Sequence, residues 1–428
     1  MKLKNGMRVH LVPFEGTEAV TVLVLTNVGS RYEDDAVWGG SHFIEHLMFK
    51  GTERRPNTID ISRTLDRYGA EFNAYTGKDL TGYYVKIAAD KAPVAVDLLH
   101  DMLFNSLYDP TEMDRERGVI IEEIKMYEEN PIMHVDDLLE QAMFKDSTLG
   151  KDIAGTAESM TAMKREDIIA YRNRHYTPNE MVVVVSGAVP ENTLALLEET
   201  FGSVESDLTP GEFEPVSAWD AQKEVRVMRQ EKDVKQIQIA LGFPMVGRKH
   251  DDIPAIKLLA SILGGAMSSR LFIEVRERRG LCYSIRASAD AYDDIGTFEI
   301  RAGLDHERLE EAMQAIFDEV KKITQNGVTD EELRHAKDRF DGAMKLGLEN
   351  SSKRAEFVGR QELYFGEVKT PEERFAEYEK VTREDVLRVA GEIFDTTRLS
   401  IAAIGPFESD EALLNKMPEG IRGKKENA

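Results

Sequence analysis

The chain is organised around one stretch, Gly39-Gly40-Ser41-His42-Phe43-Ile44-Glu45-His46-Leu47-Met48-Phe49-Lys50-Gly51-Thr52. In a helix that turns about 100° per residue, His42, Glu45 and His46 share one face and an apolar stripe forms the other. The i, i+4 spacing lets both imidazoles reach one metal ion at about 2.0–2.1 Å. Glu45 could then contact a water molecule at the same ion. The motif is His-Glu-x-x-His written backwards, so the stretch predicts a metal-binding helix.

The ends of this helix can also be predicted. The pair Gly39-Gly40 permits a tight entry, Ser41 or a neighbour can cap the first turn, and Gly51 can end the helix in a left-handed conformation. The alternative to a metal site is that His42 and His46 are partly buried histidines with satisfied ring nitrogens. A third ligand elsewhere in the chain would decide between the two interpretations.

Length and charge limit the class of protein. A chain of 428 residues is too long for one hydrophobic core and indicates two to three domains. The formal net charge of -23 argues against nucleic acid or an anionic membrane surface as a partner, since both would repel the chain. We interpret the acidity as a source of solubility.

The sequence also predicts a cytoplasmic location. The first residues lead into a strand-like pattern without the apolar core of a signal peptide. The longest apolar runs, such as residues 20–25, are too short to span a bilayer. The single cysteine, Cys282, excludes an internal disulfide. A chain from which a signal segment had been removed would show the same features.

Apolar periodicity and turn residues predict the elements of the first half. Two β-rich runs, 7–12 and 19–28, are expected to form a hairpin before the metal helix. Residues 70–76 and 81–87 are expected to form a second pair of strands, and 181–186 a strand of almost unbroken apolar character. Helices are predicted at residues 60–68, 91–103, 110–130, 135–144 and 166–176.

The helix at 110–130 offers the missing ligand. On a helical wheel, Glu116 and Glu123 lie about 20° apart, in the middle of an apolar arc. The arc is made by Met113, Val119, Ile120, Ile124, Met126 and Tyr127. A carboxylate on a buried face must be neutralised, paired or bound to metal. We therefore expect Glu123 or Glu116 to bind the metal and the other to orient a ligand. The alternative is a buried ion pair with Arg115 or Arg117.

The two halves of the chain are similar. With a constant offset of 218 (383 minus 165), residues 165–176, 181–185 and Gly187 align without gaps to 383–394, 399–403 and Gly405. The pattern indicates a duplication. At this offset His42, Glu45 and His46 fall on Ala260, Leu263 and Gly264, so the second half lacks the metal motif. We expect an N-terminal metal-binding domain at 1–207, a linker at 208–223, a C-terminal domain of the same fold at 224–410 and a charged, partly frayed tail at 411–428.

The second half has a signal of its own at residues 268–284. Its sequence predicts a helix with a basic end, a stop at Gly280 and then a strand. A cationic helix end that complements the helix dipole is sufficient to explain these residues on sequence alone.

These motifs together resemble one family. The string Gly40-x-His42-x-x-Glu45-His46-x-x-Phe49-x-Gly51-Thr52 and the later Glu116-x6-Glu123 are similar to those of the inverted-zincin metallopeptidases of the pitrilysin and insulysin family. The similarity is to the short two-domain members related to mitochondrial processing peptidase, and it covers nearly the whole chain. It implies an α+β fold of two homologous domains. Each domain is a mostly antiparallel sheet packed with helices, and the two face each other like a clamshell.

The resemblance also implies the roles of individual residues. His42, His46 and Glu123 would hold one zinc ion per chain, with Glu45 as the catalytic base and Glu116 as a supporting catalytic carboxylate. Asn73 and Ala74 lie on what looks like the family's edge strand, on which a peptide substrate pairs through its backbone. Arg276 and Tyr283 match an arginine and tyrosine that reach the bound peptide from the second domain. Cys282 departs from the small residues common at its position.

The implied activity is zinc-dependent endopeptidase cleavage of peptides or unfolded segments. Some relatives divide the zinc helix and the arginine-tyrosine pair between two chains, whereas both are present here, so a homodimer is expected and a paralogous partner chain is the alternative. Two other functions stay open. One is a non-catalytic assembly subunit on the same scaffold, and the other is a zinc hydrolase acting on a non-peptide substrate.

Overall fold

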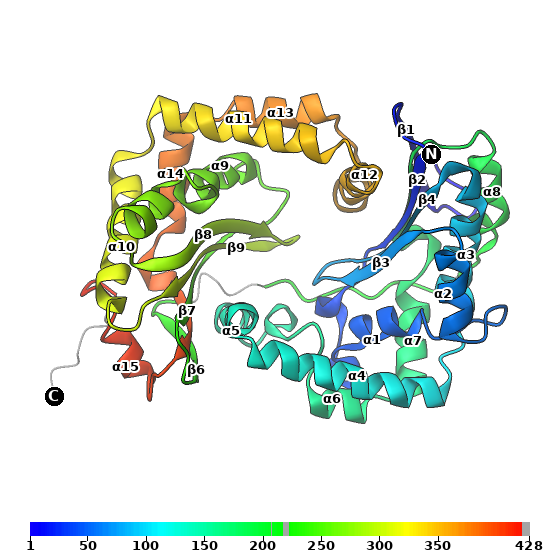
Figure 1. Cartoon of the computed structure of the whole chain (residues 1–428), viewed down its shortest axis with the longest axis horizontal. Helices are drawn as coiled ribbons and strands as arrows, with labels where there is room; N and C mark the ends of the chain where they lie inside the picture. The colour runs from blue at the N-terminus through cyan, green and yellow to red at the C-terminus, as the bar shows by residue number, and fades with distance from the viewer. Residues whose placement is uncertain (207, 217–221, 422–428) are drawn as a thin grey trace. The chain divides into compact units, whose positions relative to one another are not determined.

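The computed structural model describes residues 1–206, 208–216 and 222–421, and its chain forms two compact units (Figure 1). Unit 1 contains residues 1–125, 151–214 and 344–369. Unit 2 is made of 126–150, 215–343 and the chain from residue 370 onward. Each unit holds one five-stranded sheet and its own hydrophobic cores.

The sheet of unit 1 has the order β1-β5-β2-β4-β3. Its strands are β1 Arg8–Pro13, β2 Ala19–Thr26, β3 Glu71–Thr76, β4 Thr81–Ala88 and β5 Met181–Gly187. The β1 and β5 strands are parallel, and every other pair is antiparallel. The predicted hairpin between the first two strands is therefore wrong. β5, whose residues are all buried, lies between them because its four consecutive valines need cover on both faces.

Unit 2 repeats this topology as β6-β10-β7-β9-β8. The strands are β6 Arg226–Glu231, β7 Ile237–Val246, β8 Cys282–Ala291, β9 Ile295–Leu304 and β10 Ser400–Gly405. The offset of 218 found in the sequence carries the bounds of β1 onto those of β6, and the bounds of the helix Arg165–His175 onto those of Arg383–Ile393. The duplication and the α+β fold are confirmed.

Helices surround both sheets. In unit 1 they are α1 Gly40–Leu47, α2 Thr58–Asp66, α3 Ala92–Asn105, most of α4 Pro110–Glu129, α6 Ala157–Ala162, α7 Arg165–His175, α8 Thr193–Glu199 and α12 Ser351–Phe365. In unit 2 they are α5 Pro131–Met143, α9 Ile253–Gly264, α10 Leu309–Asn326, most of α11 Asp330–Gly347, α13 Pro371–Glu379, α14 Arg383–Ile393 and α15 Asp410–Leu414. Short helical turns occur at Ser30–Tyr32, Asp35–Val37, Ala89–Lys91, Thr148–Gly150, Pro178–Glu180, Phe201–Ser203, Phe272–Glu277 and Thr396–Arg398.

The two halves of the sequence exchange one helix each. In unit 1, α12 comes from the C-terminal half and packs on β2 and β5, where Leu23, Leu25 and Val184 meet Ala355 and Val358. In unit 2, α5 comes from the N-terminal half and packs on β7 and β10. The other face of each sheet is covered by helices of its own half. The predicted domain boundaries at 207 and 224 divide the sequence into its two duplicated halves, and they stay a prediction. The compact units differ from these halves, because unit 1 also contains residues 344–369 and unit 2 also contains residues 126–150.

The linker and tail are only partly described. Residues 208–216 and 222–223 form no helix or strand, and residues 217–221 of the predicted linker lie outside the described residues. The predicted tail is ordered as far as residue 421, because α15 forms there and Leu413, Met417 and Ile421 are buried in the core of unit 2. Residues 422–428 lie outside the described part. Among the helices that are described, none has the length and apolar character needed to cross a membrane.

The packing of α12 on the first sheet can be tested at Gly359. A β-carbon placed there would lie 2.8 Å from Leu25 Cδ1 and 3.2 Å from Val184 Cγ2. We expect Gly359→Leu to lower the free energy of unfolding by about 1–3 kcal/mol through overpacking. The matched control is Gly391→Leu on α14, where a β-carbon meets nothing within 4 Å and the change removes a helix-interior glycine. Urea unfolding of both variants is the measurement, and equal stability of the two would contradict this packing.

Candidate metal centre

The first turn of helix α1 is held by the side chain of Glu33, which lies earlier in the chain. The backbone N–H groups of Gly39 and Ser41 donate hydrogen bonds of 2.7 Å to the two oxygens of Glu33. Gly39 has a φ of +90°, and a side chain there would collide with the carbonyl oxygen of Ala154. The cap predicted at Ser41 is therefore wrong, since the Ser41 hydroxyl pairs with that of Tyr171 and Glu33 satisfies the free N–H groups.

The structure brings His42, His46 and Glu123 together. Their ligand atoms all lie within 4.8 Å of one another, and they are the only such His, Cys, Asp and Glu group found in the described residues. The Nε2 atoms of His42 and His46 are 3.2 Å apart, and Glu123 Oε2 lies 3.9 Å from the first and 3.6 Å from the second. Ligands at 2.0–2.2 Å in a tetrahedral zinc site are separated by roughly 3.3–3.6 Å. The three donors therefore fit the size of such a site.

Glu116 lies behind His46. Its Oε1 atom is 2.9 Å from His46 Nδ1, and its Oε2 atom is 2.6 Å from Lys50 Nζ. Burial alone would raise the pKa of Glu116, but the hydrogen bonds with His46 and Lys50 lower it. The Nδ1–H of His46 thus has an ionised acceptor, which leaves its Nε2 lone pair directed at the centre of the group. Glu116 contacts a candidate ligand and does not itself join the group.

His42 has no such partner. Its Nδ1 atom is buried and makes no hydrogen bond within the described part of the chain. Burial lowers the pKa of His42 to about 4, so the imidazole is neutral at pH 7 and can offer a lone pair. Two imidazoles and one carboxylate that meet in this way fit a divalent cation.

Glu45 lies beside this group on α1. Thr76 Oγ1, at the end of β3, donates a 2.5 Å hydrogen bond to Glu45 Oε2. Burial raises the pKa of the Glu45 carboxyl above its ordinary value, although the Thr76 hydrogen bond opposes this shift. A carboxylate with a raised pKa can accept a proton at a pH closer to neutrality.

The helix α4 differs from its prediction in one respect. Met113, Glu116, Ile120 and Ile124 are buried, but Val119 and Met126 are more than half exposed, so the buried arc is narrower than the apolar arc of the sequence.

The alternative prediction, a buried ion pair between one of these glutamates and Arg115 or Arg117, is wrong. Arg115 pairs with Glu112, and Arg117 donates to the carbonyl oxygens of Met160 and Met163.

Asn73 and Ala74 lie on β3, which is the edge of its sheet and pairs only with β4 among the described strands. Alternate residues of β3 point to opposite faces. Thr76 and the buried Ala74 are on the α1 side, and Tyr75 is on the side of α12, where its hydroxyl donates to Glu356. The strand is therefore fixed on both faces near Glu45, and its outer edge pairs with no other described strand.

Arg276 and Tyr283 are in unit 2. The guanidinium of Arg276 lies 5.5 Å from the centre of the Tyr283 ring, which is 71% exposed and stands at a bulge between β8 and β9. Gly280, between them, has a φ of +59° and ends the helical turn as the sequence predicts. The structure therefore brings these two residues together, and the prediction that they reach a peptide bound in unit 1 stays a prediction.

Comparison with known proteins gives the family. The profile described as "Insulinase (Peptidase family M16)" matches residues 8–157, and the "Peptidase M16 inactive domain" matches 162–340. The uncharacterized zinc protease YmxG of Bacillus subtilis is 33% identical over 408 residues, which cover 94% of this chain and 97% of the relative. A second uncharacterized zinc protease, from Streptomyces coelicolor, is 33% identical and covers 96% of this chain and 90% of its own length. The chain belongs to the M16 peptidase family.

Solved structures agree with this fold. A protease from Helicobacter pylori superposes with a TM-score of 0.88 at 24% identity, covering 95% of this chain and 98% of that one. An M16 inactive domain protein from Pseudomonas fluorescens gives a TM-score of 0.86 at 18% identity, covering 95% and 97%. In the present chain, the match to the inactive domain falls mainly on the second half of the sequence. The helix α9 of that half carries Ala260, Leu263 and Gly264 at the positions equivalent to His42, Glu45 and His46.

Three contributors to the site were missed by sequence analysis. Lys50 lies four residues after His46, so its place beside Glu116 could have been read from the helical wheel. Thr76 belongs to the predicted edge strand, and strand alternation places it on the face of Ala74. No pattern in the sequence marked Glu33 as a contributor, because its contact with the start of α1 depends on the path of a loop.

The cap of α1 leads to a pH prediction. Burial raises the pKa of Glu33 from 4.5 to about 8, against the opposing effect of its backbone hydrogen bonds. The folded protein therefore binds this proton more tightly than the unfolded chain, and the contribution of Glu33 to stability is full below about pH 4.5 and is lost as pH rises through about 8. We expect the free energy of unfolding to fall more steeply over this range in the wild type than in Glu33→Gln.

Urea unfolding at several pH values measures this difference. The exposed carboxyl of Glu191 provides the control, and Glu191→Gln should keep the wild-type slope. A Glu33→Gln variant with the same pH dependence as the wild type would show that Glu33 does not titrate as its burial requires.

Proposed function

We propose that this M16 protein is a zinc-dependent endopeptidase. The observation that carries the proposal is the convergence of His42, His46 and Glu123, with the carboxylate of Glu45 beside them. His42, His46 and Glu123 would hold one zinc ion per chain. Such an ion lowers the pKa of a bound water and polarises a peptide carbonyl.

Glu45 is the general base in this proposal. Thr76 holds its Oε2 atom, so Oε1 is the oxygen that takes the proton of the attacking water and later delivers it to the leaving amine. The raised pKa of Glu45 favours both transfers, because a very weakly basic carboxylate would hold the proton too briefly.

Glu116 is a positioning residue in this proposal. It accepts the hydrogen bond of His46 Nδ1–H, which fixes the ring tautomer and orientation, and Lys50 balances its charge. The sequence prediction grouped Glu116 with the catalytic residues, and its contacts support an indirect role through His46.

The free edge of β3 is the proposed docking place for substrate. A peptide that pairs there uses its main chain, so Asn73 and Ala74 would contribute backbone groups and specificity would be broad. Only an extended segment can pair in this way, which favours short peptides and unfolded polypeptides. Arg276 and Tyr283 are proposed to bind the same peptide from unit 2. A homodimer in the cytoplasm stays our expectation for assembly and location.

The decisive variant is Glu45→Gln. The amide keeps the size of the side chain but cannot take a proton, so we expect zinc binding to persist and peptide cleavage to fall by about 10²–10⁴-fold. Zinc content by atomic absorption and cleavage of a mixed peptide pool are the measurements, with a chelator as the control on the wild type. Zinc bound by the wild type without cleavage of any peptide would favour one of the two other functions, a non-catalytic subunit or a zinc hydrolase of a non-peptide substrate.

The role of Glu116 is tested by metal affinity. Glu116→Gln removes the charged acceptor behind His46, and we expect zinc affinity to fall by about 10–100-fold. Glu122→Gln is the matched control, because Glu122 is on the same helix, is 74% exposed and, within the described part of the chain, pairs with Lys125 alone. Competition with a zinc-binding dye measures both, and equal affinities would remove Glu116 from the site.

A further inference from the structure

Unit 1 contains a cavity of about 540 Å³ between α2 and α3. Its volume is within the range of about 300–1,000 Å³ typical of small-molecule sites. None of the metal-centre residues lines it. The lining residues are Arg55, Arg63, Thr64, Arg67, Tyr68, Pro93, Val94 and Asp97.

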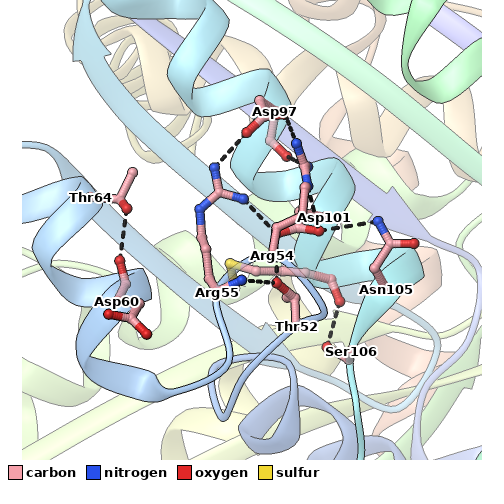
Figure 2. Close-up of polar contacts among 10 residues, drawn as sticks. Thr52, Arg54, Arg55, Asp60, Thr64, Asp97, Asp101, Asn105 and Ser106 are labelled. Atoms are coloured by element: carbon pink, nitrogen blue, oxygen red, sulfur yellow. Dashed lines mark hydrogen bonds and ion pairs between the residues drawn. The ribbon is translucent and has the colours of Figure 1, made fainter.

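One side of this cavity is a neutral and well-connected ion-pair network, which Figure 2 shows. Arg55 donates 2.5 Å hydrogen bonds to Asp97 and to the fully buried Asp101, and Arg54 contacts the same two carboxylates at 2.6 and 3.1 Å. Thr52 donates a further hydrogen bond to Asp101. Two arginines and two aspartates cancel in charge. Asp97, the one acidic residue of the lining, is thus neutralised by Arg54 and Arg55.

The remaining charge of the cavity is positive. Arg63 and Arg67 lie one helical turn apart, both are exposed, and neither has an ion-pair partner within the described residues. Of the nearby carboxylates, Asp60 accepts from Asn57 and Asp90 pairs with Lys91. Asp66 precedes Arg67 in the sequence, but it is exposed and does not line the cavity. Two guanidinium groups are therefore free to bind an anion, in a chain whose net charge is -23.

The rest of the lining is suited to an apolar or planar group. Pro93 and Val94 form an apolar wall from the start of α3, and Tyr68 presents its ring with Arg67 and Lys91 within 6 Å of it. The hydroxyl of Thr64 donates to the carbonyl oxygen of Asp60, so its proton is already used. Inorganic phosphate alone would leave these walls without contacts.

We infer that this cavity binds a small organic phosphate, whose oxyanion pairs with Arg63 and Arg67 and whose apolar or planar part lies against Tyr68, Pro93 and Val94. Guanidinium groups suit this ligand because they give paired hydrogen bonds to phosphate oxygens. The same arginines would also attract inorganic phosphate. Contacts with the apolar wall are available only to an organic phosphate, so the difference in affinity between the two ligands distinguishes them. This inference does not depend on the peptidase proposal.

The test uses the full-length protein and two probes, phenyl phosphate and inorganic phosphate, in isothermal titration calorimetry. We expect phenyl phosphate to bind at least about tenfold more tightly than inorganic phosphate. The double variant R63A/R67A should weaken phenyl phosphate by at least about tenfold, and Tyr68→Ala should weaken phenyl phosphate but not inorganic phosphate.

The matched control is K164A/K321A, which removes two exposed positive charges far from these residues in the sequence and outside the cavity lining. It should keep wild-type affinity, which separates local binding from a change in overall charge. Circular dichroism melting shows whether each variant is folded. No binding of either probe to the wild type, or equal losses in the two double variants, would overturn the inference. Equal affinity for the two phosphates would overturn the assignment of an organic ligand.

Discussion

The meeting of two imidazole nitrogens 3.2 Å apart with a carboxylate oxygen is the constraint around which unit 1 is arranged. Glu116 is the hydrogen-bond partner of His46 Nδ1, and the Nε2 atom of that ring faces His42 and Glu123. Three electron-rich atoms at such separations are stable only when a cation or a proton lies among them. The surrounding structure holds them together nonetheless, through elements that come from three separate parts of the chain.

Each of these elements has its own anchor. The helix α1 is fixed at its start by the buried carboxyl group of Glu33, and α4 is fixed by Arg117, which donates to the carbonyl oxygens of Met160 and Met163. The strand β3 is held on one face through Thr76 and on the other through Tyr75 and Glu356. A site built in this way depends on the full sheet and its cover, so the second half of the chain supports the metal centre even though it lacks the motif.

Local sequence patterns were sufficient to predict part of the metal centre and of the fold, but not the contacts between distant segments. The i, i+4 histidines, the two glutamates on α4 and the offset between the halves were all visible in the sequence because each depends on spacing within one element or on direct repetition. The order of the strands was not, since β5 enters between β1 and β2 from a point more than 150 residues later. Glu33 and the exchange of α5 and α12 were missed for the same reason: they depend on contacts between distant segments, which periodicity does not record.

The exchange of helices has a consequence for how the polypeptide is made. When a ribosome has completed β5, the first sheet has all its strands, but Leu23, Leu25 and Val184 must wait for α12, which is translated more than 160 residues later. During that interval one side of a finished sheet stays uncovered and open to wrong association. The first sheet is therefore fully covered only near the end of synthesis, and termination between the end of β5 and residue 351 releases a fragment in which this apolar face lacks α12.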